Sequence, residues 1–141
     1  YSKIPVKCDG LYDRFEKQVV EDEMDGNYTV YTFYSGKQKV AEITDYGYEK
    51  TVSGITVYSS NISTPDGVYP GMLIKKVLAI KGVTGYYNDG FRLELKGYYI
   101  DFETMTAAGS KAFDDAYLKG TEMKLSSTYF NNTSKVVSIS F

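Results

Sequence analysis

The sequence predicts an α+β fold: a mainly antiparallel sheet of about seven strands, one main helix over residues 72–81 packed on it, and one or two short helices. Short runs rich in tyrosine, threonine and valine recur along the chain, and turns that contain glycine separate them. Residues 72–81 show the helical spacing of apolar positions most clearly. Because hairpin turns outnumber helices, neighbouring strands are expected to run antiparallel.

Length and composition indicate one folded unit. The chain has 141 residues, of which 43% are hydrophobic and 24% are charged. A chain of this length can bury roughly two thirds of the surface that its unfolded form exposes. Neither a low-complexity linker nor a shift in composition divides it. We therefore expect a single domain over residues 1–141.

The N-terminal segment carries two short predicted elements. Residues 3–7 are expected to form a strand. Apolar residues recur at four-residue spacing at Leu11, Phe15 and Val19, which predicts a short helix over residues 11–20. A strand is the alternative there, because the segment ends in two β-branched valines.

The clearest local signal is a hairpin. Two β-prone runs, residues 27–34 and 38–45, flank a turn at residues 35–37 whose central glycine accepts a left-handed conformation. Residues 50–60 are predicted as the next strand, with a bulge at residues 53–54.

The predicted main helix follows a loop over residues 61–71 that contains two prolines and two glycines. Within residues 72–81 one stripe is apolar and the opposite side is charged, and Gly82 supplies a C-terminal cap. The side chains expected to face the sheet are Leu73 or Ile74, Val77 and Leu78.

After residue 82 the pattern returns to strands. Turns at residues 88–90 and 96–97 separate three short β-prone runs. Residues 103–119 follow no single period, and their later half has the spacing of a short helix. Strands are predicted over residues 121–129 and 135–141. In the last of these the expected apolar face consists of Val137, Ile139 and Phe141.

The composition excludes several chemistries. The chain has no histidine and a single cysteine, Cys8, so it lacks catalytic triads with an imidazole and multi-cysteine metal sites. Phosphate-loop and dinucleotide-binding motifs are also missing. Glu21, Glu23 and Asp25 imitate the spacing of a calcium loop, but Thr32 occupies its twelfth position, where a bidentate carboxylate is required. We predict no cofactor and no metal site.

Charge and hydropathy exclude two classes of partner. The net charge is −2, and the 16 basic residues form no cluster of the kind that neutralises phosphates. No nucleic-acid partner is therefore predicted. The longest apolar stretch is interrupted by Lys75 and Lys76, so no transmembrane segment is predicted. The chain starts at Tyr1 without an initiator methionine, which suggests that an N-terminal signal was removed.

One stretch resembles a known group of proteins. Residues 63–72, Ser-Thr-Pro-Asp-Gly-Val-Tyr-Pro-Gly-Met, precede Val77, Leu78 and Gly82. This pattern resembles the Gly-Met, helix, Gly segment of small bacterial envelope lipoproteins of the SmpA/BamE type and of modules similar to β-lactamase inhibitor protein. Residues 97–102 and 135–139 are similar to the strands that follow it. Leu73 and Lys76 depart from the pattern, which has a hydroxyl cap and an acid there.

The resemblance covers about half of the chain and implies an exported fold with a helix on an antiparallel sheet. It implies a secreted, periplasmic or outer-membrane-associated protein. It does not imply one function, because such modules range from assembly subunits to inhibitors.

The function is predicted from the classes of protein that these exclusions leave open. The first hypothesis is a non-catalytic exported binding domain of a bacterial cell envelope, with a protein or glycan partner. Its candidate binding residues are Tyr69, Tyr86, Tyr87, Tyr98 and Tyr99, whose rings suit an aromatic platform. The alternative is a small glycan hydrolase that uses two of the carboxylates of Glu94, Asp101 and Glu103. A further alternative is an inhibitor of a secreted enzyme.

Overall fold

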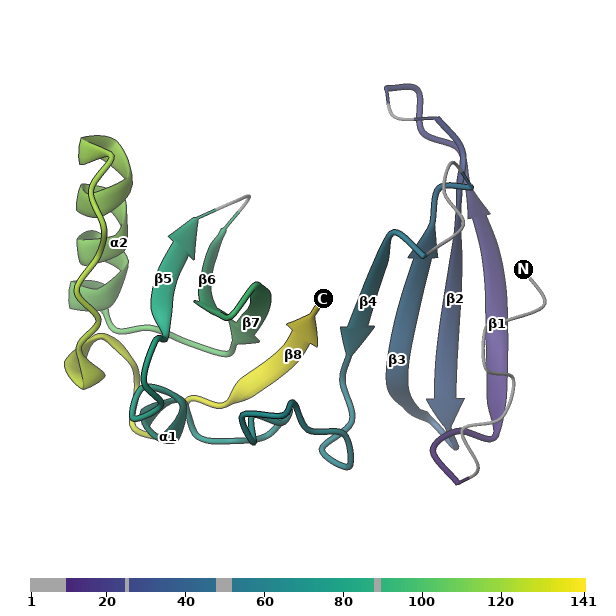
Figure 1. Ribbon diagram of the computed structural model, residues 1–141, viewed down its shortest axis with the longest axis horizontal. Helices are drawn as coiled ribbons and strands as arrows, with labels where there is room; N and C mark the ends of the chain where they lie inside the picture. Colours follow the sequence, from purple (N-terminus) through teal and green to yellow (C-terminus); the bar gives the residue numbers. More distant parts are fainter. Residues whose placement is uncertain (1–9, 25, 48–51, 88–89) are drawn as a thin grey trace.

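A computed structural model describes residues 10–24, 26–47, 52–87 and 90–141. It contains an eight-stranded antiparallel sheet in the order β1-β2-β3-β4-β8-β7-β6-β5, two helices and a 3₁₀ turn (Figure 1). The predicted α+β class is therefore confirmed. The strands are β1 (Arg14–Val20), β2 (Tyr28–Ser35), β3 (Gln38–Asp45), β4 (Gly54–Val57), β5 (Thr84–Tyr87), β6 (Phe91–Leu95), β7 (Tyr98–Phe102) and β8 (Val136–Ser140). The helical elements are α1 (Ile74–Val77), α2 (Ala107–Lys119) and η1 (Ser127–Tyr129).

The last strand joins two meanders into one sheet. Strands β1 to β4 follow one another in sequence order, and β5 to β7 form a second meander after α1. Strand β8 lies between them and pairs with both β4 and β7. Its pairing with β4 covers two positions, Thr56 with Ser140 and Val57 with Ile139. The two halves are therefore held together chiefly by the C-terminal strand.

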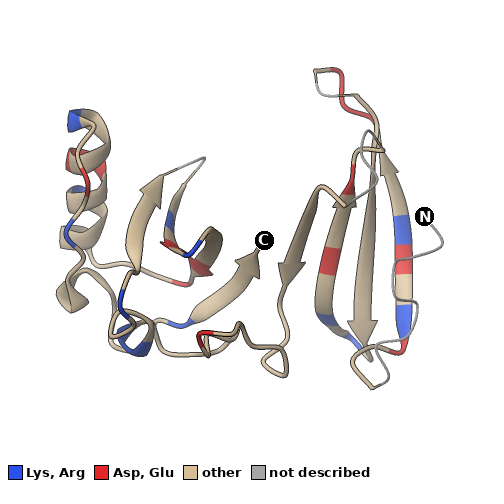
Figure 2. Cartoon of the chain, viewed as in Figure 1, with Lys and Arg blue, Asp and Glu red and all other residues tan. Residues whose placement is uncertain are grey.

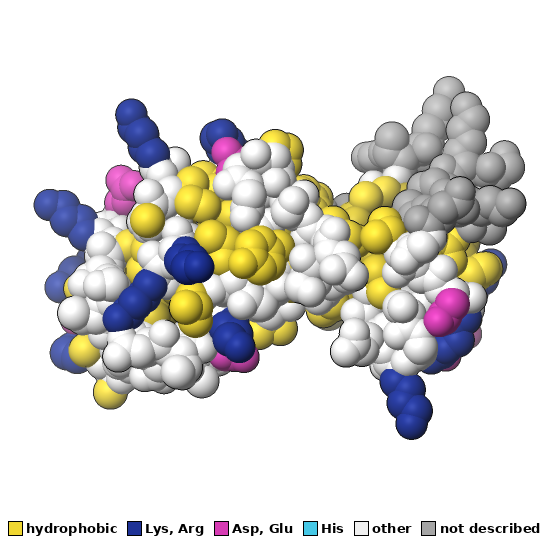
Figure 3. Space-filling model, turned by 90° about the horizontal axis from the view of Figure 1, so that it is seen from below, with side chains coloured by type: hydrophobic (Ala, Val, Ile, Leu, Met, Phe, Trp, Pro, Cys, Tyr) yellow, Lys and Arg dark blue, Asp and Glu magenta, His cyan; other side chains and the backbone are white. Residues whose placement is uncertain are grey.

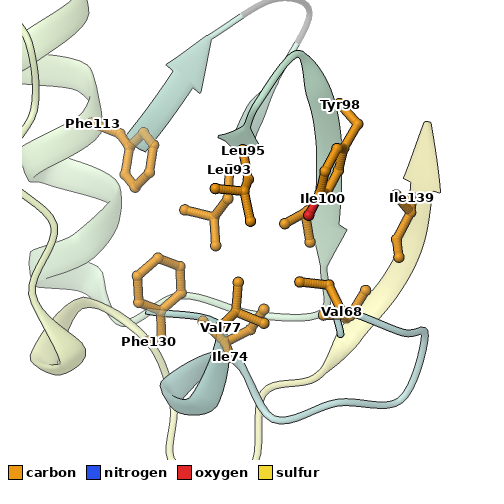
Figure 4. Close-up of a cluster of buried hydrophobic side chains, with 11 residues drawn as sticks. Val68, Ile74, Val77, Leu93, Leu95, Tyr98, Ile100, Phe113, Phe130 and Ile139 are labelled. Carbon is orange, nitrogen blue, oxygen red and sulfur yellow. The ribbon is translucent and has the colours of Figure 1, made fainter. Parts of the chain in front are cut away.

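The main hydrophobic core lies in the second half of the sheet. Buried side chains from the strands meet others from α1, α2 and the loop before α1 (Figure 4). The cluster consists of Val68, Ile74, Val77, Leu93, Leu95, Tyr98, Ile100, Phe113, Phe130, Val136 and Ile139. Both helices thus pack on one face of the sheet, the face that carries Leu93, Ile100 and Ile139.

The prediction that residues 72–81 form the main helix is wrong. Helix α1 has four residues, whereas α2 has thirteen. Leu73 precedes α1 and makes no side-chain capping hydrogen bond. The Thr106 hydroxyl, by contrast, accepts a hydrogen bond from the Gly109 N–H at 3.1 Å, and left-handed Gly120 ends α2. The predicted burial of Ile74 and Val77 is confirmed, while Leu73 and Leu78 are half-buried.

The helix predicted over residues 11–20 is also wrong, and the strand alternative is correct. The four-residue spacing of Leu11, Phe15 and Val19 is a multiple of two, so it also places these residues on one face of a strand. Strand β1 pairs with β2 over seven positions, from Arg14 opposite Tyr34 to Val20 opposite Tyr28. That ladder supplies backbone hydrogen bonds that an isolated short helix cannot match.

The predictions for the last third need two corrections. Residues 121–126 form no strand, and η1 occupies 127–129. The predicted apolar face of the last strand is also wrong, because only Ile139 is buried, while Val137 and Phe141 are 45% and 53% exposed. A register shift opposite Asp101 and Phe102 turns Val136 inward instead.

The other predicted strands agree with the structure in place, although β4 is shorter than expected. The hairpin of β2 and β3 and the meander of β6 and β7 are confirmed. Residues 3–7 and Cys8 lie outside the described residues, as does part of the turn at 88–90. No helix among the described residues has both the length and the apolar character needed to cross a membrane.

Candidate functional site

The two faces of the sheet differ in character, because successive side chains of a strand point to opposite sides. The face opposite the core, termed the polar face, carries mostly hydroxyl, phenol and charged groups, and charges of both signs lie along the strands (Figure 2). Across the sheet the polar face includes Glu16, Tyr34, Glu42, Thr56, Tyr58, Ser140, Ser138, Asp101, Tyr99, Glu94, Arg92 and Tyr86. Helices α1 and α2 pack on the core face, so no helix of the described residues covers the polar face.

Two tyrosines meet above β6 on the polar face. Tyr86 on β5 lies opposite Arg92, and Tyr99 on β7 lies opposite Glu94. The ring centroids of Tyr86 and Tyr99 are 4.8 Å apart, with the planes inclined by 38°. A hydrogen bond with the Tyr86 side chain, followed by charge repulsion and burial, raises the pKa of Tyr99. The pair therefore forms an aromatic ridge on this face.

A charged group lies beside this ridge. Arg92 Nε and Asp101 Oδ1 form an ion pair at 2.9 Å, and Ser138 Oγ donates a hydrogen bond to Asp101 Oδ2 at 2.9 Å. Both carboxylate oxygens of Asp101 therefore have a partner. The ion pair fixes the orientation of the Arg92 guanidinium. The terminal nitrogens of Arg92 have no hydrogen-bond partner within the described part of the chain. They remain available to a ligand.

A second cluster lies on β3 and at the end of β4. Lys39 Nζ is 2.8 Å from Glu42 Oε2 and 4.8 Å from the centroid of the Tyr58 ring. The hydrogen bond with Glu42 raises the pKa of Lys39. Burial, and then the negative charge of Glu42, raise the pKa of Tyr58. The hydroxyls of Thr56 and Ser140, 3.1 Å apart, connect this cluster to β8.

A polar pocket continues from the second cluster. Its volume is about 490 Å³, within the range of small-molecule sites. Lys39 and Tyr58 contribute to its wall, and serine and amide side chains supply other polar groups. These groups are Ser35, Gln38, Ser59, Ser60 and Asn61. Such a lining suits a ligand with many hydroxyl groups.

The structure separates the five tyrosines predicted as binding residues. Tyr86 and Tyr99 meet on the polar face. Tyr98 is buried in the core, where its hydroxyl lies 3.1 Å from that of Thr64. Tyr87 packs on Tyr117 of α2, with the ring centroids 4.0 Å apart. Tyr69, 37% exposed, lies on the loop before α1.

The members of the polar face that sequence reasoning missed include Tyr58, Arg92 and Ser138. Their association depends on β8 lying between β4 and β7, which no local pattern encodes. The alternation of Arg92 and Glu94 with apolar residues is a sequence signal that both face away from the core.

The three carboxylates that a hydrolase could use have different surroundings. Asp101 is bound on both oxygens, by Arg92 and Ser138. Glu103 Oε2 accepts a hydrogen bond from the Lys135 N–H at 3.0 Å, and Glu94 lies on the polar face beside Tyr99. No set of three acidic or cysteine side chains in the described ranges comes together as metal ligands, and Asp25 lies outside them.

The phenols of Tyr58, Tyr98 and Tyr99 are predicted to ionise at higher pH than free tyrosine. Burial is the largest cause of the raised pKa for Tyr58 and Tyr98, and the hydrogen bond with Tyr86 is the largest for Tyr99. Each folded-state pKa lies above the ordinary value of 10.0. Their contribution to stability is therefore complete below that pH and is lost as pH rises through the folded-state values.

A titration by near-ultraviolet absorbance checks this prediction, because the chain has no tryptophan. The folded protein should retain a late-ionising group of tyrosines, which Tyr98→Phe reduces, and the protein in denaturant should not. A single transition at the pH of free tyrosine in the folded protein would contradict it.

Comparison with protein-family models, with curated proteins and with solved structures found no match to the chain. What the protein does must therefore be inferred from the chemistry of its own surface.

Proposed function

We propose that the chain is a non-catalytic binding domain, exported to a bacterial cell envelope, and that its polar face binds a glycan. One observation carries the proposal. The stacked pair Tyr86 and Tyr99 lies beside an arginine that Asp101 holds in place, on a sheet face that no described helix covers.

The chemistry of the polar face suits a sugar. Aromatic rings offer an apolar surface to the C–H groups of a pyranose, while hydroxyl and guanidinium groups bond its hydroxyls. Three of the acids on this face form ion pairs with bases, so it carries no strong field of one sign; the pairs are Arg14 with Glu16, Lys39 with Glu42, and Arg92 with Asp101. A neutral glycan fits this pattern better than a polyanion does.

A binding role without catalysis is supported by the carboxylates. A hydrolase needs one carboxylic acid to give a proton and a second group to act as a base or nucleophile. Asp101 is held by Arg92 and Ser138, and Glu103 is held by the Lys135 backbone. These bonds fit structural roles. Export is supported by the resemblance of residues 63–82 to envelope lipoproteins, which motivates the choice of glycans as the first ligands to test.

Loss of the tyrosine pair is expected to weaken glycan binding strongly. We predict that the double variant Tyr86→Ser/Tyr99→Ser weakens binding by about tenfold or more, because the stacking surface is lost. Affinity electrophoresis measures the effect. The gels contain a soluble neutral polysaccharide, namely xylan, mannan or mixed-linkage β-glucan, and polygalacturonate serves as the charged comparison. The matched control is Tyr117→Ser, which removes a 58% exposed ring from α2.

The wild-type chain and the control should be retarded alike by at least one neutral polysaccharide. Equal retardation of the double variant, with its melting temperature unchanged, would show that the polar face is not the site. If polygalacturonate alone, or none of the polymers, retards the wild-type chain, a neutral glycan is ruled out as the ligand.

A further inference from the structure

The segment between α2 and η1 runs along α2 in an extended conformation. Gly120 follows the last turn of α2, while Tyr129 contacts Gly109 in the first turn. Thirteen helical residues rise about 20 Å. Residues 121–126 return over this length, which requires roughly 3 Å per residue and therefore an extended backbone (Figure 1).

This extended backbone lacks the pairing of a strand. Across the described part of the chain, no backbone hydrogen bond involves Glu122, Met123, Lys124 or Leu125. Buried or half-buried backbone groups are ordinarily paired, and an unpaired extended segment is a template for an added strand. Met123 and Leu125 are half-buried, so the segment is fixed against the body of the protein on one side.

A groove runs beside the segment. Its volume is about 890 Å³, and its second wall comes from the end of α1 and the start of β5, the edge strand of the sheet. The apolar side chains that line it are Leu78, Ile80, Val83, Met123 and Leu125. All five are half-buried, so an occupant would complete their burial.

The rim of the groove is positively charged. Lys75 and Lys124 line it with one acid, Glu122. Lys75 Nζ donates to the neutral side chain of Asn132, and Lys124 has no partner among the described residues. Figure 3 shows basic side chains around hydrophobic side chains on the face seen from below, in the half of the molecule that contains α1. Charge complementarity therefore favours an acidic occupant.

We propose that this groove binds an extended acidic peptide of a protein partner, which adds as a β-strand to residues 122–125. Main-chain hydrogen bonds would hold the peptide, its apolar side chains would enter the groove, and its carboxylates would meet Lys75 and Lys124. The site is separate from the polar face and does not depend on glycan binding.

The experiment is an NMR titration of the full chain with a capped seven-residue peptide that alternates glutamate and valine. We expect saturable shifts centred on residues 122–125 and on Thr84, together with slower exchange of the Met123 and Lys124 amide hydrogens. Two comparison peptides replace glutamate with lysine or the central valine with proline, which has no N–H to donate. Neither should bind.

Variants separate this site from the polar face. Lys124→Glu should weaken peptide binding about fivefold, because an attraction at the rim becomes a repulsion. The matched control Lys37→Glu lies in the exposed β2–β3 turn, and it should bind like the wild type, as should Tyr86→Ser/Tyr99→Ser.

Three results would overturn the proposal. One is the absence of shifts at the solubility limit of the peptide. Another is equal binding of the lysine or proline peptide. The last is that only vesicles of anionic phosphatidylglycerol, and not the acidic peptide, perturb residues 122–125, which would identify a membrane surface as the occupant.

Discussion

Replacing Phe130 with alanine is expected to lower the free energy of unfolding by about 3–5 kcal/mol, because a large buried ring is lost together with its packing. Phe130 is 2% exposed and is the largest fully buried side chain of the described residues. Its ring meets that of Phe102 edge-on, with the centroids 5.1 Å apart. Removing it leaves a cavity between α1, α2 and the sheet, which the surrounding elements cannot easily collapse to fill (Figure 4).

Denaturant unfolding followed by circular dichroism measures this loss. The matched control is Phe141→Ala, since Phe141 is 53% exposed and packs mainly on Tyr98, with ring centroids 5.6 Å apart. Its removal should cost roughly 1 kcal/mol, because little apolar surface is lost and no cavity forms. Equal losses for the two variants would contradict the position of the core beneath β5 to β8.

The fold could be predicted where its contacts are local. The β2–β3 hairpin and the β6–β7 meander each depend on a turn of a few residues with glycine at the position of positive φ. Their registers follow from those turns, so sequence alone specifies both the strands and the alternation of their faces.

The assembly of the candidate site could not be predicted in this way. Strand β8 pairs with β4 across 84 residues of chain, as the contact between the Thr56 and Ser140 hydroxyls illustrates. The bond between Ser138 and Asp101 depends on the same insertion. Neither neighbour can be identified from periodicity, because a strand pattern states which residues share a face but not which strand lies beside it.

The error in the main helix has a different origin. Residues 72–81 have a strong apolar stripe, but only four of them form a helix. Their apolar side chains are buried against the preceding loop and β8, and the Ile74 N–H donates to the Ser134 carbonyl at 2.9 Å. The signals for α2 were present, namely Thr106 as a cap and Gly120 as a stop. The weak amphipathic pattern between them concealed the helix, because only Gly109 and Phe113 of α2 are buried.

Gly109→Ala is expected to destabilise the protein by about 2–4 kcal/mol, although alanine favours a helix interior over glycine by ~1 kcal/mol. An added Cβ at residue 109 would lie 2.2 Å from the carbonyl oxygen of Tyr129 and 2.9 Å from its Cβ. That carbonyl cannot move away freely, because it accepts a hydrogen bond from the Thr106 N–H at 2.9 Å. Relief of the clash would therefore separate η1 from the first turn of α2 and break this bond.

The sign of the change is the decisive measurement. Ala108→Gly, at the exposed neighbouring position, should cost about 0.5–1 kcal/mol through helix propensity alone, and it serves as the matched control. If propensity governed both sites, Gly109→Ala would stabilise the protein by a similar amount. A higher melting temperature for Gly109→Ala would thus disprove the close approach of Tyr129. A lower one, with α2 still formed by circular dichroism, would show that this glycine is required because backbone from η1 occupies the space of a side chain.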